Sequence, residues 1–181
     1  MSENQNIRWA EPKDAAHIVR LIQALAAYEN EPAHSVKVTE ADILRDGFCE
    51  PETSARRFEC LIAEYSGRPV GLCLFFHNYS TWEGCAGIYV EDLFVEEQAR
   101  GLGLGRAIMT VLARIAQERN CGRIDLSVLE WNPTRAFYNR IKMTHMKEWR
   151  SYRMEKAVIT ALAKTAADIN GDRRPPRKAL A

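Results

Sequence analysis

The sequence predicts a mixed α/β (α+β) fold in which antiparallel strands come first and a strand–helix–strand unit follows. Three apolar, strand-like segments follow one another in the middle of the chain with short turns between them, which predicts a meander. Segments with apolar residues at helical spacing lie on either side of the meander. A turn with three glycines joins the third of these strands to a helix.

The first quarter of the chain is predicted to form a strand and two helices. Residues 7–10 read as a short strand, and the proline and acids of residues 11–14 suit the first turn of a helix. Thr39 and Asp42 resemble a capping box that opens a second short helix, which Gly47 is expected to end. Residues 51–57 are expected to form a loop. The apolar face of the first helix consists of Ala15, Ile18, Leu21, Ile22, Leu25 and Tyr28.

The centre of the chain carries the meander. Residues 58–65 and 70–77 are rich in apolar side chains and are separated by the turn residues 66–69, which predicts a hairpin. A third strand over residues 85–95 follows a turn at residues 82–84.

After Gly105 the apolar spacing changes to that of an amphipathic helix, which Asn120 and Gly122 are expected to close. Residues 124–129 are predicted to form another strand. Asn132 and Pro133 suit the N-cap and first turn of a short helix that runs to about residue 140. A last strand is predicted over residues 149–154, and a terminal helix over residues 157–167. The apolar face of the long helix consists of Ile108, Val111, Leu112, Ile115 and Ala116.

Length and composition favour one globular domain that binds a small ligand. The chain has 181 residues, 46% hydrophobic and 27% charged, which suits a domain with a buried core. We place the domain at residues 5–168 and expect the basic tail, residues 169–181, to be a disordered terminus rather than a nucleic-acid-binding segment. No apolar run reaches the roughly 18 residues of a membrane-spanning helix, and no signal peptide is visible, so a cytoplasmic protein is expected. The net charge of +1 gives no field that attracts nucleic acid or a membrane.

The cysteines and histidines do not predict a metal site. The five cysteines include no C-x-x-C pair, and the histidines are scattered. Cys60, Cys73 and Cys85 lie in apolar stretches and are interpreted as buried free thiols.

The segment from residue 89 to residue 106 is the most informative about function. A strand leads into a loop with Gly101, Gly103 and Gly105, and the loop opens a helix. Glycines at such a junction let the backbone approach a ligand, and the helix N-terminus attracts negative charge, so the arrangement suits a pyrophosphate. It is neither a P-loop, because no Lys-Ser or Lys-Thr follows, nor a dinucleotide fingerprint, because Arg106 replaces the third glycine.

The motif that fits is Arg-x-x-Gly-x-Gly, from Arg100 to Gly105, which resembles the acetyl-CoA loop of the GNAT N-acetyltransferase superfamily. Three blocks are similar to the diamine (spermidine/spermine) and thialysine acetyltransferase branch, as are residues 25–29 and 46–48. The resemblance covers about residues 7–160. It implies a mostly antiparallel twisted sheet with a splayed, bulged central strand and helices on both faces, and it implies a homodimer. The three blocks are Glu91-Asp92-Leu93-Phe94-Val95, Glu130-Trp131-Asn132 and Phe137-Tyr138.

The same resemblance implies that the chain transfers an acetyl group from acetyl-CoA to a primary amine of a small molecule in a ternary complex. The implied acceptors are a diamine, a polyamine or a lysine-like amino acid such as thialysine, and no metal is implied. The residues implied to bind CoA are Leu93, Phe94, Val95, Arg100, Gly101, Leu102, Gly103, Leu104, Gly105, Arg106, Asn132 and Phe137.

Aminolysis of a thioester needs a neutral amine, a stabilised oxyanion and a proton for the departing thiolate. Glu91 lies on a mostly apolar strand, where an acid is energetically costly unless it is paired or has a function. We therefore assign Glu91 to amine binding and, through water, to deprotonation of the amine. Asp92 points to the opposite face in a regular strand, and both acids line one site only if a bulge intervenes. The resemblance implies that bulge, and it implies that Tyr138 is the general acid. The alternative is a pair of solvated acids at a strand end.

At the acceptor end, Tyr28 and Glu29 match the amine-binding positions of the branch, and acids there attract a second ammonium group. The alternative is a solvated helix end. Trp82 and Trp131 are candidates for an apolar or cation-attracting wall, or for core packing. Ser80 replaces an acid of the polyamine-using members, which disfavours spermidine and spermine. Lys142 replaces a glycine of the family, which puts the shape of the acceptor pocket in question.

Two other functions stay open at this point. One is a CoA-binding sensor that has lost catalysis, and the other is acetylation of protein amino groups.

Overall fold

The computed structural model describes residues 4–49 and 56–166. The chain divides into two compact units, Met1–Thr134 and Arg135–Ala181. The single domain expected for residues 5–168 stays a prediction. The tail predicted for residues 169–181 lies outside the described residues.

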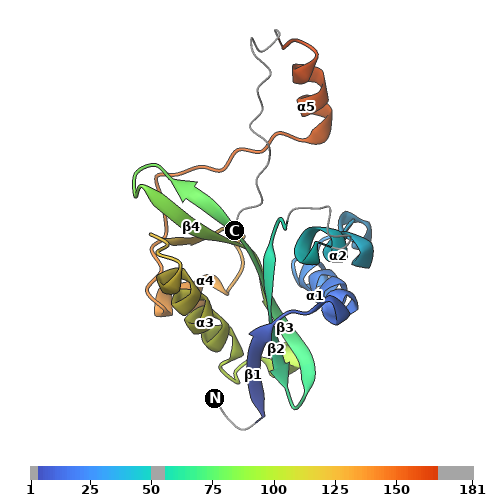
Figure 1. Cartoon of the computed structure of the whole chain (residues 1–181), viewed down its shortest axis with the longest axis vertical. Coiled ribbons are helices and arrows are strands. Elements are labelled where there is room, and N and C mark those ends of the chain that lie inside the picture. The colour runs from blue at the N-terminus through green and yellow to red at the C-terminus, as the bar shows by residue number, and fades with distance from the viewer. Residues whose placement is uncertain (1–3, 50–55, 167–181) are drawn as a thin grey trace. The chain divides into compact units, whose positions relative to one another are not determined.

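The first unit is built on a five-stranded sheet in which each strand neighbours the next in sequence (Figure 1). The strands are β1 (Gln5–Trp9), β2 (Glu59–Tyr65), β3 (Arg68–Ser80), β4 (Cys85–Val95) and β5 (Ile124–Leu126). The first four pair antiparallel, and β5 runs parallel to β4. The predicted meander and the mixed, mostly antiparallel sheet are confirmed, although β5 is shorter than the strand predicted over residues 124–129.

Helices cover both faces of this sheet, as predicted (Figure 1). On one face lie α1 (Ala15–Tyr28), entered through a 3-10 turn at Pro12–Asp14, and α2 (Glu40–Phe48). Apolar side chains of these helices form a core with Cys60 and Ile62 of β2, Leu72 and Leu74 of β3, and Phe94 of β4. On the opposite face lies α3 (Leu104–Glu118), which buries Leu104, Ile108, Met109, Leu112, Ile115 and Ala116.

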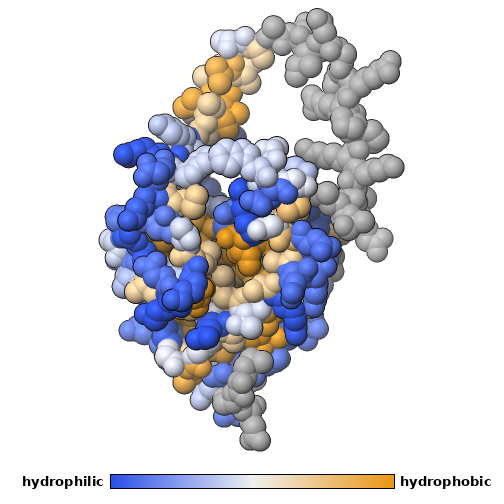
Figure 2. All heavy atoms as spheres, turned by 90° about the vertical axis from the view of Figure 1, so that its left-hand side faces the viewer, coloured by the Kyte–Doolittle hydropathy of each residue, from blue (hydrophilic) through white to orange (hydrophobic). Residues whose placement is uncertain are grey.

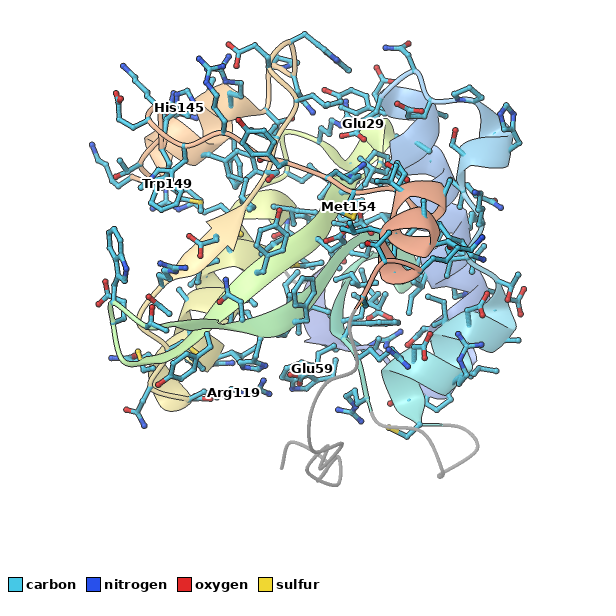
Figure 3. All side chains as sticks on the ribbon, turned by 90° about the horizontal axis from the view of Figure 1, so that it is seen from above. Glu29, Glu59, Arg119, His145, Trp149 and Met154 are labelled. Atoms are coloured by element: carbon cyan, nitrogen blue, oxygen red, sulfur yellow. The ribbon has the colours of Figure 1, made fainter. Side chains whose placement is uncertain are left out.

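Polar contacts fasten α3 to the sheet at its far end. Asn120 has a φ of 53° and closes the helix, as predicted. The neighbouring Arg119 donates a hydrogen bond to the Glu59 carboxylate at the start of β2, at 2.9 Å (Figure 3). The helix is therefore held at both ends, by its entry loop and by this ion pair.

The corner between β1 and α1 is held by a buried ion pair. The Asp14 carboxylate, 2% exposed, accepts hydrogen bonds from both terminal nitrogens of Arg8, at 2.6 and 2.9 Å, and from the Glu11 N–H at 2.8 Å. Burial alone raises the pKa of Asp14, but the bonds from Arg8 and Glu11 outweigh it, so the pKa is lowered. The charge is therefore fully paired.

The prediction that Gly47 ends α2 is wrong. The helix continues through Phe48, and Cys49 takes the left-handed conformation with a φ of 60°. Gly47 instead allows a close approach, because a Cβ there would lie 2.6 Å from Cε2 of Phe58. The predicted capping box is confirmed, with Thr39 Oγ1 accepting a hydrogen bond from the Asp42 N–H at 3.2 Å.

The second unit contains the short helices α4 (Arg135–Arg140) and α5 (Lys156–Ala163), which correspond to the two helices predicted there. The last strand predicted over residues 149–154 is wrong. A strand needs a hydrogen-bonded partner, and the described part of this unit contains no strand. No helix in residues 4–49 or 56–166 has the length and apolar character required to cross a membrane.

Candidate active site

A bulge interrupts β4 at Glu91. Asp92 pairs with Leu74 of β3, but Val90 pairs with the next residue, Phe75, so Glu91 has no partner in β3. Directly opposite residues share a face of the sheet, and Leu74 belongs to the core under α1 and α2. Asp92 therefore points to the α1 face, whereas Val90 points to the α3 face. The bulge implied by the resemblance is confirmed, and it changes the face to which the strand directs its side chains.

Beyond the bulge, one edge of β4 is free among the residues that the structure describes. β5 pairs with β4 only from Ile88 to Val90, and β5 ends at Leu126. Beyond Glu91, residues 92–95 of β4 pair with β3 and with no other described strand. Backbone N–H groups on the other edge can therefore donate to a ligand.

The glycine-rich loop leads from β4 into α3 and is open. Gly101 and Gly103 have φ of 79° and 85°, and a Cβ on either would meet nothing within 4 Å. Gly103 is the N-cap of α3 and provides no side-chain cap, so the first-turn N–H groups have no intrahelical acceptor. Gln5 holds the loop to β1 by donating to the Leu102 carbonyl at 2.7 Å. The loop thus offers an uncapped helix N-terminus, which suits a phosphate group.

Arg100 connects this loop to the end of α1. Its Nε donates to the Val95 carbonyl at 3.1 Å, and its guanidinium lies 4.3 Å from the centroid of the Tyr28 ring and 5.7 Å from that of Phe94. The stacking keeps the exposed guanidinium beside the loop. A residue implied to bind CoA and a residue implied to bind the amine are therefore in direct contact.

Asn132 joins the same group of residues. It is 6% exposed, and its Oδ1 accepts hydrogen bonds from the Thr134 N–H at 2.9 Å and from the Tyr28 hydroxyl at 3.3 Å. The first bond forms an Asx turn before α4, which begins at Arg135, so Asn132 is not the N-cap that the sequence predicted. The Trp131 ring lies 6.3 Å from the Tyr28 ring but is 52% exposed, so one of its faces is available to a ligand.

Three carboxylates gather where α1 ends and β4 bulges. Glu29 directly follows α1 (Figure 3), and Glu91 and Asp92 lie at the bulge. Burial, together with the negative charges of Glu91 and Glu29, raises the pKa of Asp92 to about 6. Burial also raises the pKa of Glu29, with a contribution from Glu31. Such a group attracts cations, above all one with two positive charges.

Of three further predicted site residues, Trp82 lies far from the bulge, whereas Leu104 and Arg106 lie on the first turn of α3. Trp82 lies at the tip of the β3–β4 hairpin and is 85% exposed. Because β4 rises about 3.3 Å per residue, the hairpin tip is roughly 20 Å from the bulge. Leu104 is buried in the core, so it can offer a ligand only its backbone N–H. Arg106 is exposed on the first turn of α3.

Phe137 and Tyr138 belong to the second unit. Both lie on α4, where their rings make an edge contact with centroids 5.2 Å apart. Their roles in CoA binding and proton donation stay predictions.

Sequence reasoning missed two features of this site. The stacking of Arg100 on Tyr28 joins residues far apart in the chain, and no local pattern signals it. The burial of Asp92 was also missed. Glu91 and Asp92 are adjacent acids, and the sequence does not reveal that Asp92 is the one that pairs with β3. Among the described residues, no group of histidines, cysteines and acids is arranged to hold a metal ion.

Comparison with known proteins gives consistent matches along most of the chain. Residues 17–143 match the model of a family described as "Acetyltransferase (GNAT) family". The thialysine N-epsilon-acetyltransferase of Bos taurus is 34% identical over 169 residues, which cover 87% of this chain and 96% of that protein. The enzyme of the same name from Caenorhabditis elegans is 30% identical over 165 residues, which cover 89% of this chain and 98% of that protein.

The fold has close counterparts among solved structures. An integron cassette protein from the mobile metagenome of V. cholerae superimposes with a TM-score of 0.72 at 24% identity. The match covers 91% of this chain and all of that protein.

Proposed function

The chain belongs to the acetyltransferase (GNAT) family, and from this premise we propose that it transfers the acetyl group of acetyl-CoA to a primary amine of a small molecule. The family that the motifs resemble is thereby confirmed. The observation that carries the proposal is the open glycine-rich loop at the N-terminus of α3, one short loop away from the three carboxylates of β4 and α1.

The loop fits the pyrophosphate of CoA. Its first-turn N–H groups, the helix dipole and the positive charge of Arg100 all favour an anion, and the open space at Gly101 and Gly103 admits one. The free edge of β4 beyond the bulge supports a further step of the proposal. Its N–H groups would bind the thioester carbonyl and stabilise the oxyanion that forms during attack.

The carboxylates favour an acceptor with more than one ammonium group. We propose a diamine or a lysine-like amino acid, in agreement with relatives named thialysine N-epsilon-acetyltransferase. Glu29 and Asp92 would bind the ammonium groups, and the exposed face of Trp131 would contact the carbon chain. Tyr138 is proposed to protonate the departing thiolate, as the resemblance implies.

We also propose that the protein works as a homodimer in the cytoplasm. The second unit supports subunit contact, because its helix α5 exposes the apolar side chains Val158, Ile159 and Leu162 (Figure 2). Light scattering after gel filtration would test this, with twice the chain mass expected and the chain mass contradicting it.

The enzymatic proposal is tested by mixing the protein with acetyl-CoA and a panel of amines and following thiol release. We expect turnover with diamines and thialysine, and little with monoamines of the same length. CoA binding without turnover across the panel would support the sensor alternative. Turnover confined to peptide amino groups would support protein acetylation.

Loop function is tested separately with Gly103→Ala and the matched control Gly67→Ala. Both glycines have positive φ and open space around them, and Gly67 lies in the distant β2–β3 turn. We expect both variants to lose similar stability, but only Gly103→Ala to bind CoA roughly tenfold more weakly in calorimetry, because it shifts the donating N–H groups. Equal CoA affinity in both variants would contradict the role of the loop.

A further inference from the structure

The two adjacent acids of the bulge differ in ways that bear on which one removes the proton from the amine. We propose that Asp92, rather than Glu91, is the direct proton acceptor for the substrate ammonium group, and that Glu91 and Glu29 act on Asp92 through their charge. The inference rests on the proposed function and assigns a catalytic residue within the same site.

Geometry separates the two carboxylates. Asp92 lies opposite Leu74 on the α1 face, close to the residues that end α1, whereas Glu91 is the unpaired residue of the bulge. Asp92 is half-buried and Glu91 is exposed. Within the described residues, the side chain of Asp92 makes no hydrogen bond or ion pair, so none of these residues competes with a substrate for its carboxylate oxygens.

In the part of the chain that the structure describes, the surroundings of Asp92 contain negative or neutral groups and no cation that lowers its pKa. Glu29 approaches from α1 and Glu91 from its own strand, and both carboxylates raise the pKa of Asp92 after burial has raised it. The thiols of Cys60 on β2 and Cys73 on β3 also lie near Asp92. Burial raises the pKa of Cys73 to about 12 and that of Cys60 well above its usual value, so both thiols stay neutral.

These surroundings make Asp92 a stronger base than a solvated acid, while leaving it ionised at neutral pH. With a pKa of about 6, it is mostly a carboxylate at pH 7.5. A base with a pKa nearer the working pH accepts a proton more readily than an ordinary aspartate with a pKa of about 3.9. The carboxylate of Glu91, by contrast, is exposed to solvent.

Asp92 takes one proton from R–NH3⁺, and the lone pair of the resulting R–NH2 forms the N–C bond to the thioester carbonyl carbon. Collapse of the tetrahedral adduct breaks the C–S bond. The nitrogen loses a second proton and the sulfur gains one, so the products are the amide, CoA thiol and one proton, which Asp92 releases to solvent.

The test compares Asp92→Asn with Glu91→Gln, which each replace one carboxylate by an isosteric amide at neighbouring positions. The readout is kcat/KM against pH for the best diamine, with CoA affinity measured by calorimetry as the control for an intact loop. For the wild type we expect kcat/KM to rise as the pH rises through about 6, because the ionised form of Asp92 accepts the proton. This rise is the acidic limb of the profile.

We expect Asp92→Asn to lower kcat/KM by about 10²–10⁴-fold, with loss of that acidic limb and unchanged CoA affinity. Glu91→Gln should lower it by less than about tenfold and keep the limb, moved to lower pH because a neighbouring negative charge is gone. Asp92→Glu should recover part of the lost kcat, because a carboxylate is restored.

The opposite pattern, in which the limb survives in Asp92→Asn and disappears in Glu91→Gln, would overturn the inference and leave the proposed function intact. Failure of the proposed function looks different, because the wild-type protein itself would then release no thiol with any amine of the panel.

Discussion

Two aspartates of the first unit are withdrawn from solvent in opposite surroundings. Asp14, at the corner between β1 and α1, accepts hydrogen bonds from Arg8 and from a backbone N–H, and its pKa is lowered. Asp92, at the bulge of β4, has other carboxylates as its charged neighbours, and burial raises its pKa to about 6. A carboxylate that holds a fold together is paired, whereas one left unpaired among like charges costs stability and is available for chemistry.

The largest effect on stability is expected from Asp14→Asn. The substitution removes the charge that Arg8 pairs with in a buried place, and we expect it to lower the free energy of unfolding by about 2–4 kcal/mol at pH 7.5. Urea unfolding would measure the loss. Glu64→Gln is the matched control, because Glu64 is the second partner of Arg8. The Glu64 side chain is 16% exposed, so we expect this variant to lose less free energy of unfolding. A loss below about 0.5 kcal/mol for Asp14→Asn would remove the contrast between the two aspartates.

We expect Asp92→Asn, in contrast, to raise the free energy of unfolding. A carboxyl group whose pKa is raised by folding destabilises the native state once the pH exceeds its unfolded pKa, and the cost reaches its full size above the folded pKa of about 6. We therefore expect the variant to be more stable than the wild type at pH 8, by at most about 3 kcal/mol, because one pKa unit corresponds to about 1.4 kcal/mol. Urea unfolding between pH 8 and pH 5 should show the advantage shrinking, and a constant or inverted difference would contradict the assignment.

The smallest shift in a pH profile is expected from Glu29→Gln, beside the weaker ammonium binding that the loss of this carboxylate brings. Removing this negative charge should lower the pKa of Asp92 and move the acidic limb of the kcat/KM profile down by roughly 0.2–0.5 pH unit, because the charge acts across partly solvated space. Glu31→Gln serves as the control, since Glu31 raises the pKa of Glu29 but is not among the groups that raise that of Asp92. Equal shifts in the two variants would show that the effect is not specific to Glu29.

Local patterns predicted most of the fold. The bounds of β4 agree with the strand expected at residues 85–95, and the capping box at Thr39 and the closure of α3 at Asn120 appear where the residue types place them. Each depends on neighbours within a few positions in the chain. Sequence reasoning failed where a distant residue decides the outcome. Gly47 looks like a helix terminator, but Phe58 of the following segment explains why a glycine is there.

In the candidate site, too, local patterns predicted one part and not another. The glycine-rich turn was predictable, because its residues are contiguous and their chemistry suits an anion. The bulge came only with the family resemblance, since adjacent acids do not reveal which one pairs with β3. The strand expected at residues 149–154 shows the converse case, in which a segment that looks like a strand has no partner strand among the described residues of its own unit.

The extra residue in β4 has a consequence for how this site can change over generations. A point substitution can exchange either acid for another side chain and so retune which amine is accepted, while the bend in the strand stays in place. Restoring a regular pleat while keeping the pairs on either side of the bulge requires the loss of a codon, because Val90 and Asp92 already oppose the consecutive residues Phe75 and Leu74. The bulge therefore depends on the number of residues in β4, whereas the acceptor preference depends on which side chains those residues carry. The acceptor preference can change by substitution while the bulge is kept.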